Sequence, residues 1–284
     1  SAGGATTASR WVVVHDDRDV SYIPNADAVA ANDNWTTYDA FQGGSSPNPS
    51  AGVDHIHIAY GKDGSGDPLW VSTWASDNPE LAYHDDPTTG PWTGVNKQSD
   101  GSNLSLRRFA VLWGNDVWVA VGKMNSNNRV IFRSTNGSTW DHVDVSGVSG
   151  ITNEGLYTIA SNGNGTWWFA QNNRIYQSTD NAQNWSLLHT LLDASNNNPG
   201  KIRSMAYTNN TLIVGIMNTG EFFTAAASDL TDWSAGTTLN SHAGTCFDQQ
   251  TRIAAANGRV VVVGGQHKST FDVNGKTVTM DENG

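Results

Sequence analysis

Hydrophobic and polar positions follow a pattern that returns every 46 to 51 residues along this chain. Each repeat begins with a large apolar residue followed by alanine, continues through a polar or glycine-containing turn, and ends in a run of β-forming residues. Most of these units close on a single tryptophan. The opening alanines are Ala59, Ala110, Ala160, Ala206 and Ala254, and the closing tryptophans are Trp92, Trp140, Trp185 and Trp233.

A repeat of this length that carries several short strands is typical of one blade of a β-propeller. Four units are complete, and a partial unit stands at each end of the chain. The N-terminal one has strand-like runs at 10–15 and 20–24 and a closing Trp35, and the C-terminal one has an Asn274-Gly275 hairpin signal. We therefore expect an all-β fold, a six-bladed β-propeller of four-stranded antiparallel blades, with five or seven blades as the alternatives. Residues 1–10 are predicted to form an N-terminal arm, and residues 11–284 a single propeller domain.

Composition narrows the setting of this fold. The chain has 29 Gly and 12 Trp but only 15% charged residues, which favours turn-rich β structure. Its net charge of −11 argues against a nucleic-acid partner, because phosphates require a basic face. No apolar run is long enough to cross a bilayer, so membrane insertion is not expected. The small polar residues at 1–9 suggest a processed or excised chain.

The segments around the closing tryptophans resemble a known repeat. Ser178-Thr179-Asp180-Asn181-Ala182-Gln183-Asn184-Trp185 is similar to the Asp-box, the Ser-x-Asp-x-Gly-x-x-Trp turn of the sialidase-like propellers, with Ala182 in the glycine place. The segment from Ser134 to Trp140 is a shorter version with asparagine in place of aspartate. The resemblance implies a propeller with degenerate Asp-box (BNR) repeats. It also implies that Trp140, Trp185 and Trp233 are structural and lie largely buried between blades.

Candidate binding residues precede the opening step of each unit, where the innermost strand of a blade reaches the mouth of the axial channel. Four of the ten arginines fall in this register. Clustered guanidinium groups suit a carboxylate, sulfate or phosphate. The predicted ligand-binding residues at this position are His57, Arg108, Glu154, Tyr157, Arg203 and Arg252. Sialidases hold their substrate carboxylate with three arginines and use a tyrosine nucleophile assisted by a glutamate, so the resemblance would give Tyr157 and Glu154 those roles in an enzyme.

Two tryptophans outside the repeat, Trp74 and Trp113, are predicted to supply aromatic surface for a sugar ring. No metal site is predicted. His55 and His57 alternate on one strand without a visible third ligand. The loop at 63–67 has alternating oxygen donors of the kind that calcium prefers, but it lacks the glycine and the distal glutamate of a calcium loop. No cofactor is expected.

Three functions remain open. The sequence favours a non-catalytic, extracellular or virion-surface recognition module, similar to a phage tail or adhesin domain, that binds a surface glycan or another host or envelope component. The first alternative is a sialidase-like glycoside hydrolase, which the missing arginine before Ile23-Pro24 argues against because sialidases have an Arg-Ile-Pro segment there. The second is a purely structural virion or scaffold protein. Self-association, or a place in a larger assembly, stays open.

Overall fold

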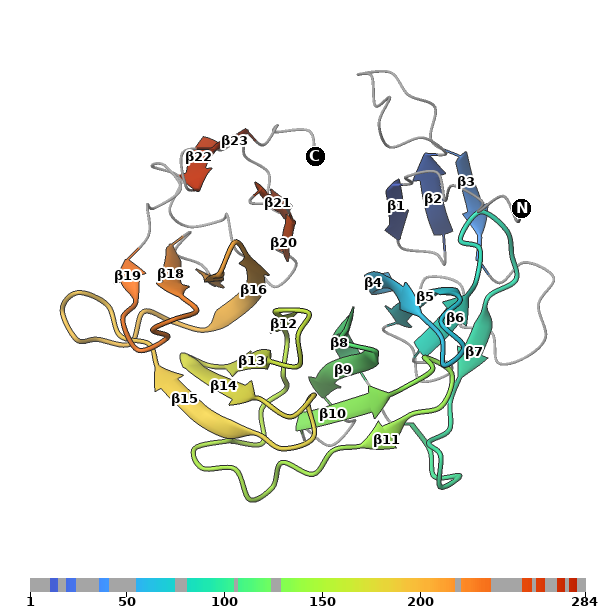
Figure 1. The fold of residues 1–284 in the computed structure, drawn as a ribbon, viewed down its shortest axis with the longest axis horizontal. Coiled ribbons are helices and arrows are strands. Elements are labelled where there is room, and N and C mark those ends of the chain that lie inside the picture. The colour runs from blue at the N-terminus through green and yellow to red at the C-terminus, as the bar shows by residue number, and fades with distance from the viewer. Residues whose placement is uncertain are drawn as a thin grey trace, which may run out of the picture.

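The fold is made of short antiparallel sheets placed around a common centre (Figure 1). The computed structural model describes residues 11–14, 19–23, 36–40, 55–74, 81–104, 107–123, 129–217, 221–235, 252–256, 259–263, 270–273 and 276–279. Every regular element within these residues is a β-strand. The chain is thus an all-β propeller, as predicted from the repeat, while the expected number of six blades stays a prediction. The predicted N-terminal arm and Trp35 lie outside the described residues.

Four blades are complete, each a four-stranded sheet whose strands follow one another in sequence from the centre outward (Figure 1). They correspond to the four complete units of the sequence repeat. Their strands are β4 (His55–Lys62), β5 (Pro68–Trp74), β6 (Leu81–His84) and β7 (Thr93–Val95); β8 (Arg107–Gly114), β9 (Val117–Lys123), β10 (Arg129–Ser134) and β11 (Asp141–His142); β12 (Ile159–Ser161), β13 (Trp167–Gln171), β14 (Arg174–Ser178) and β15 (Ser186–Thr190); and β16 (Ile202–Thr208), β17 (Thr211–Ile216), β18 (Phe222–Ala226) and β19 (Ser234–Ala235).

The two ends of the chain form smaller sheets. At the N-terminal end, β1 (Trp11–Val14), β2 (Asp19–Ile23) and β3 (Thr36–Asp39) make a three-stranded sheet. At the C-terminal end, β20 (Arg252–Ala256) pairs with β21 (Arg259–Val263), and β22 (Thr270–Val273) pairs with β23 (Lys276–Thr279). β22 and β23 pair antiparallel up to Val273 and Lys276, and the predicted hairpin residues Asn274 and Gly275 lie outside the described residues.

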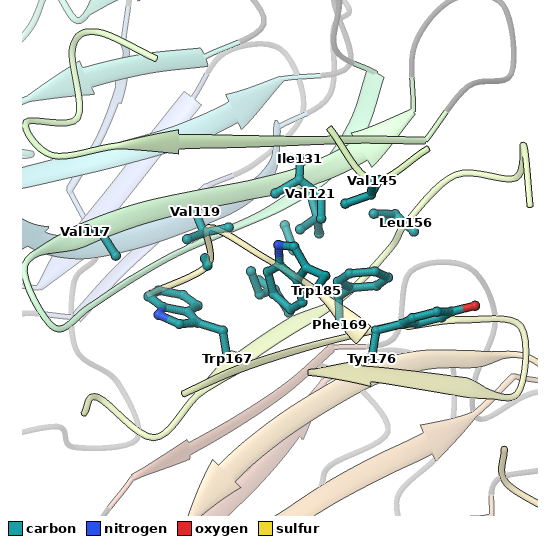
Figure 2. Packing of buried hydrophobic residues seen from close by; sticks show 13 residues of the cluster. Val117, Val119, Val121, Ile131, Val145, Leu156, Trp167, Phe169, Tyr176 and Trp185 are labelled. Atoms are coloured by element: carbon teal, nitrogen blue, oxygen red, sulfur yellow. The ribbon is translucent and has the colours of Figure 1, made fainter. Parts of the chain in front are cut away.

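The hydrophobic core is divided among the seams between neighbouring blades. In the seam of Figure 2, apolar side chains of β9 and β10, among them Val121 and Ile131, face Trp167, Phe169 and Trp185 of the next blade. The alanine of each apolar-alanine step lies on an inner strand, and it is small because the next blade packs against it. Ala110 and Ala160 are both buried. Each seam removes several aromatic rings from water, and this burial is the main stabilising contribution to the ring.

Trp140 and Trp185 lie buried in these seams, as predicted from the Asp-box resemblance, whereas the same prediction is wrong for Trp233. Trp92 and Trp140 are 2% and 0% exposed, and Trp185 is 8% exposed. Trp140 packs with Leu69 and other residues of the preceding blade. Trp233 differs, because it is only partly buried and packs at the margin of its seam.

The turns before these tryptophans are held by side-chain caps. Ser178 Oγ donates to Asp180 Oδ1 at 2.7 Å, and the same carboxylate accepts the backbone N–H groups of Gln183 at 3.1 Å and Asn184 at 2.9 Å. Desolvation by burial acts to raise the pKa of Asp180, but these donors, together with the Asn184 side-chain amide that donates to Oδ2 at 2.7 Å, outweigh it and hold the pKa at about 2. In the shorter copy of the turn, Asn136 Oδ1 accepts the N–H groups of Ser138 and Thr139 at 3.0 and 2.9 Å. The polar residues of these turns therefore satisfy one another.

Candidate functional site

The inner strands of three complete blades are irregular at their first residues. The pairing between β4 and β5 shifts between His55 and His57, that between β8 and β9 shifts between Arg107 and Ala110, and that between β16 and β17 shifts between Ile202 and Ser204. A β-bulge inserts an unpaired residue and redirects its side chain, and bulges are common beside functional sites. These three bulges coincide with the register in which His57, Arg108 and Arg203 were predicted to bind a ligand.

The bulge in β16 turns Arg203 toward the neighbouring blade. The guanidinium carbon of Arg203 lies 3.6 Å from the centre of the Tyr157 ring, which precedes β12. A guanidinium stacked on an aromatic face contributes about 0.5–2 kcal/mol, more when water is excluded. Arg203 is itself 7% exposed, so this cation–π pair is largely desolvated. The structure thus brings together two predicted site residues from different blades.

The loop that carries Tyr157 is fixed by a buried amide. Gln171, at the end of β13 and 2% exposed, accepts the backbone N–H of Thr152 at 2.7 Å and donates to the carbonyl oxygens of Thr152 and Glu154. Gly155 follows in a narrow space, since a Cβ there would lie 2.9 Å from Lys123 Cβ and 3.3 Å from the Tyr157 hydroxyl. These contacts hold the ring of Tyr157 where Arg203 can stack on it.

Glu154 forms an ion pair across the same seam. Its Oε2 accepts a hydrogen bond from Lys201 Nζ at 3.1 Å, and the two side chains are 49% and 48% exposed. An ion pair this exposed adds little stability because water screens it. The pair neutralises the charges of Lys201 and Glu154, and among the described residues no carboxylate forms an ion pair with Arg203.

The candidate site consists of six residues. Three of them, Glu154, Tyr157 and Arg203, were predicted from the sequence as ligand-binding residues. The other three, Gln171, Lys201 and Met217, were not. A sequence signal existed for two of them, since Lys201 stands two positions before Arg203 in the predicted register, and Gln171 is the polar last residue of an otherwise apolar strand. Met217, whose sulfur accepts the Arg203 Nε–H at 3.3 Å, carried no signal.

The other predicted residues are placed by their strands. Arg108 lies in the bulge of β8, Arg252 is the first residue of β20, and Trp74 is the last residue of β5. For these three residues only the position along the strand is described. His57 is partly buried in β4, and its carbonyl oxygen accepts a hydrogen bond from Ser72. Their convergence with Arg203 remains a prediction.

Trp113 lies at the far end of β8 from Arg107 and packs within a seam. A Cβ on Gly61 would overlap its ring, with the nearest carbon at 2.2 Å, so the glycine is what lets the indole lie against β4. The ring is partly buried against the core that includes Trp118 and Trp140. Trp113 is therefore separated along its strand from the predicted channel mouth, and its role there as a sugar platform is still untested.

The remaining polar clusters have local explanations. Asp63, in the loop considered for calcium, uses Oδ1 to accept the N–H groups of Ser65 at 2.8 Å and Asp67 at 2.9 Å. Across the described residues no group of three or more His, Cys, Asp or Glu side chains is placed to hold a metal ion. The same residues include no helix that is both long and apolar enough to span a membrane.

Solved structures share this architecture at low sequence identity. No family model and no curated protein matches the chain. The chain is similar to a protein in a nidogen–laminin complex, with a TM-score of 0.65, 10% identity, and coverage of 96% of this chain and 94% of the other. It is also similar to YCF48 bound to a D1 peptide, with a TM-score of 0.60, 11% identity, and 98% and 82% coverage. YCF48 from Cyanidioschyzon merolae gives a TM-score of 0.56 at 16% identity, with 81% and 72% coverage. At these identities the likeness establishes the propeller fold alone.

Proposed function

We propose that this protein is a non-catalytic recognition module, a six-bladed propeller of the degenerate Asp-box type, that binds a ligand where its inner strands begin. The observation that carries this proposal is the recurrent bulge at the first residues of β4, β8 and β16. A repeated irregularity weakens each blade's own pairing, and it falls where the polar and aromatic residues of the register lie. A ring built for stability alone would gain from regular strands at these positions.

The proposed setting is extracellular or at a virion surface, and the proposed ligand is a surface glycan or another envelope component. The net charge of −11 and the turn-rich, polar chain support a secreted or surface-exposed module. The cross-blade group of Tyr157, Arg203, Glu154 and Lys201 offers the mixture that sugar recognition uses: an aromatic ring, a guanidinium and paired charges. The nidogen–laminin and YCF48–peptide structures make a polypeptide ligand the natural second class to include in a screen.

The test is a glycan array probed with the protein and two variants. Tyr157→Ala removes the ring under Arg203, and we expect it to weaken binding at least tenfold. Lys62→Ala is the matched control, because Lys62 is exposed at the opposite end of β4 and should leave binding unchanged. A protein that binds no glycan and no surface component in the screen would contradict the recognition function and favour the purely structural alternative.

Glycoside hydrolysis is the alternative that the geometry supports less well. A tyrosine nucleophile needs a base within hydrogen-bond reach. Within the described residues no hydrogen bond joins the Tyr157 hydroxyl to the Glu154 carboxylate, which instead pairs with Lys201. We expect no turnover of fluorogenic sialosides. Turnover that disappears in Tyr157→Phe or Glu154→Gln would establish the enzyme.

A further inference from the structure

Three Asn-Gly pairs lie in turns of the described structure, and they differ in how firmly their atoms are bound. Asparagine is a thermolabile residue, and its side chain is most reactive before glycine, whose backbone nitrogen is not shielded by a Cβ. The three pairs are Asn136-Gly137, Asn162-Gly163 and Asn164-Gly165. Three more Asn-Gly pairs, which begin at residues 257, 274 and 283, lie outside the described residues.

Hydrogen bonds restrain the first two pairs. The N–H of Gly137 donates to Ser134 Oγ at 2.8 Å, and the N–H of Gly163 donates to Ser161 Oγ at 3.1 Å. The asparagine before each glycine is restrained as well, since its Oδ1 accepts two backbone N–H groups. In both pairs the glycine nitrogen and the asparagine side chain are therefore held by bonds that must break before the two can react.

The third pair lies in the turn between β12 and β13 and is held less firmly. Asn164 is exposed, and its backbone N–H donates to Asn162 Oδ1 at 2.8 Å. Among the described residues neither the side-chain amide of Asn164 nor the N–H of Gly165 forms a hydrogen bond. Gly165 has a φ of +85°, a conformation that glycine adopts without strain. The side chain of Asn164 can thus turn toward the Gly165 nitrogen from the water side.

We propose that Asn164 is a site of spontaneous deamidation, at which the folded protein converts this asparagine into aspartate and isoaspartate. The backbone nitrogen of Gly165 gives up its proton and forms a bond to Cγ of Asn164. The bond from Cγ to the side-chain nitrogen breaks, and that nitrogen leaves as ammonia together with the proton. Water then opens the five-membered imide: cleavage of the new bond to Cγ gives aspartate, and cleavage at the backbone carbonyl carbon gives isoaspartate.

The reaction changes a contact between two turns of the same blade. The carbonyl oxygen of Gly165 accepts the N–H of Asn181, in the Asp-box-like turn, at 3.1 Å. Isoaspartate lengthens the main chain by one carbon directly before Gly165 and so displaces this carbonyl group. We expect the isoaspartate form, separated from the parent protein by ion exchange, to melt at a lower temperature. An equal melting temperature would show that the contact adjusts and would contradict this effect.

The experiment incubates the whole protein in warm, mildly alkaline buffer and measures deamidation at each asparagine by peptide mass spectrometry. Fragment ions separate Asn162 from Asn164, which lie in the same peptide. We expect Asn164 to react at least tenfold faster than Asn136 and Asn162, with isoaspartate among its products. The urea-unfolded protein is the matched control, because unfolding removes the restraining bonds and should let all three pairs react at similar rates. A folded-state rate at Asn164 no higher than at the other two would overturn the proposal.

Two variants test the cause of the selectivity. Asn164→Gln keeps an amide but requires a six-membered ring, so we expect no modification at this position and unchanged rates at Asn136 and Asn162. Ser161→Ala removes the acceptor of the Gly163 N–H and should raise the rate at Asn162 several-fold without affecting Asn136. An unchanged rate at Asn162 in Ser161→Ala, or the same preference for Asn164 in urea, would show that hydrogen bonding does not select the site. Aspartate without isoaspartate would show direct hydrolysis and overturn the imide route.

Discussion

Asp180, the aspartate of the best-formed Asp-box-like turn, is expected to stabilise the fold both through its charge and as a hydrogen-bond acceptor, and replacing it by asparagine or alanine separates these two contributions. The pKa of Asp180 is held at about 2 against an ordinary 3.8. A shift of this size corresponds to about 2.4 kcal/mol at 1.36 kcal/mol per pKa unit. Since the carboxylate is partly open to water, screening reduces the expected contribution to about 1–1.5 kcal/mol. We expect Asp180→Asn to cost about that amount at pH 7 and Asp180→Ala to cost about 2–3 kcal/mol, because alanine also leaves the N–H groups of Gln183 and Asn184 without their acceptor.

Urea unfolding between pH 2 and pH 7 measures both the contribution of the Asp180 charge and that of its hydrogen-bond acceptor. The folded-state pKa of Asp180 lies below the unfolded value, so its charge stabilises the protein above pH 3.8 and this contribution is lost as the pH falls through 2. The difference between the parent protein and Asp180→Asn should therefore vanish at the acidic end, while the extra cost of Asp180→Ala persists. Asn136 provides the internal reference, because an amide already caps the sister turn there. Equal destabilisation by asparagine and alanine, or a difference between parent and Asp180→Asn that does not change with pH, would refute the assignment.

Four further predictions concern the seams and their turns. Trp185→Ala should lower the free energy of unfolding by about 3–5 kcal/mol in urea titration, because the indole is 8% exposed in the seam of Figure 2. Gly137→Ala should cost more than 2 kcal/mol, since its φ is +73° and a Cβ would lie 2.4 Å from a methyl carbon of Leu69; Ala182→Gly should change stability by less than about 1 kcal/mol, because relief at φ +64° offsets the loss of a buried methyl group. Burial lowers the pKa of His84 below 6.5, so acidification from pH 7 to pH 5 should reduce the melting temperature of the parent protein more than that of His84→Asn.

The blade pattern was predictable because it depends on local chemistry repeated at a fixed period. The apolar-alanine step places a small residue on each inner strand, where the neighbouring blade approaches closely, and Ala110 and Ala160 are buried for that reason. The capped turns were predictable from Ser178 and Asp180, whose hydrogen bonds span only a few residues. Trp233 was predicted less well: its turn has the same indole but packs at the edge of a seam, and packing depends on the neighbouring blade rather than on the motif.

The candidate site was predictable only as a register and not as a set of contacts. Sequence spacing placed Tyr157 and Arg203 near the same position of adjacent repeats, which limits them to one end of the ring. Arg203 lies in the bulge between Ile202 and Ser204 of β16, and the residues of the bulge itself include no glycine or proline that would have indicated it. Glu154 pairs with Lys201, while Arg203 stacks on the Tyr157 ring, so the contacts of these residues depend on how adjacent blades meet and cannot be read from their spacing in the sequence.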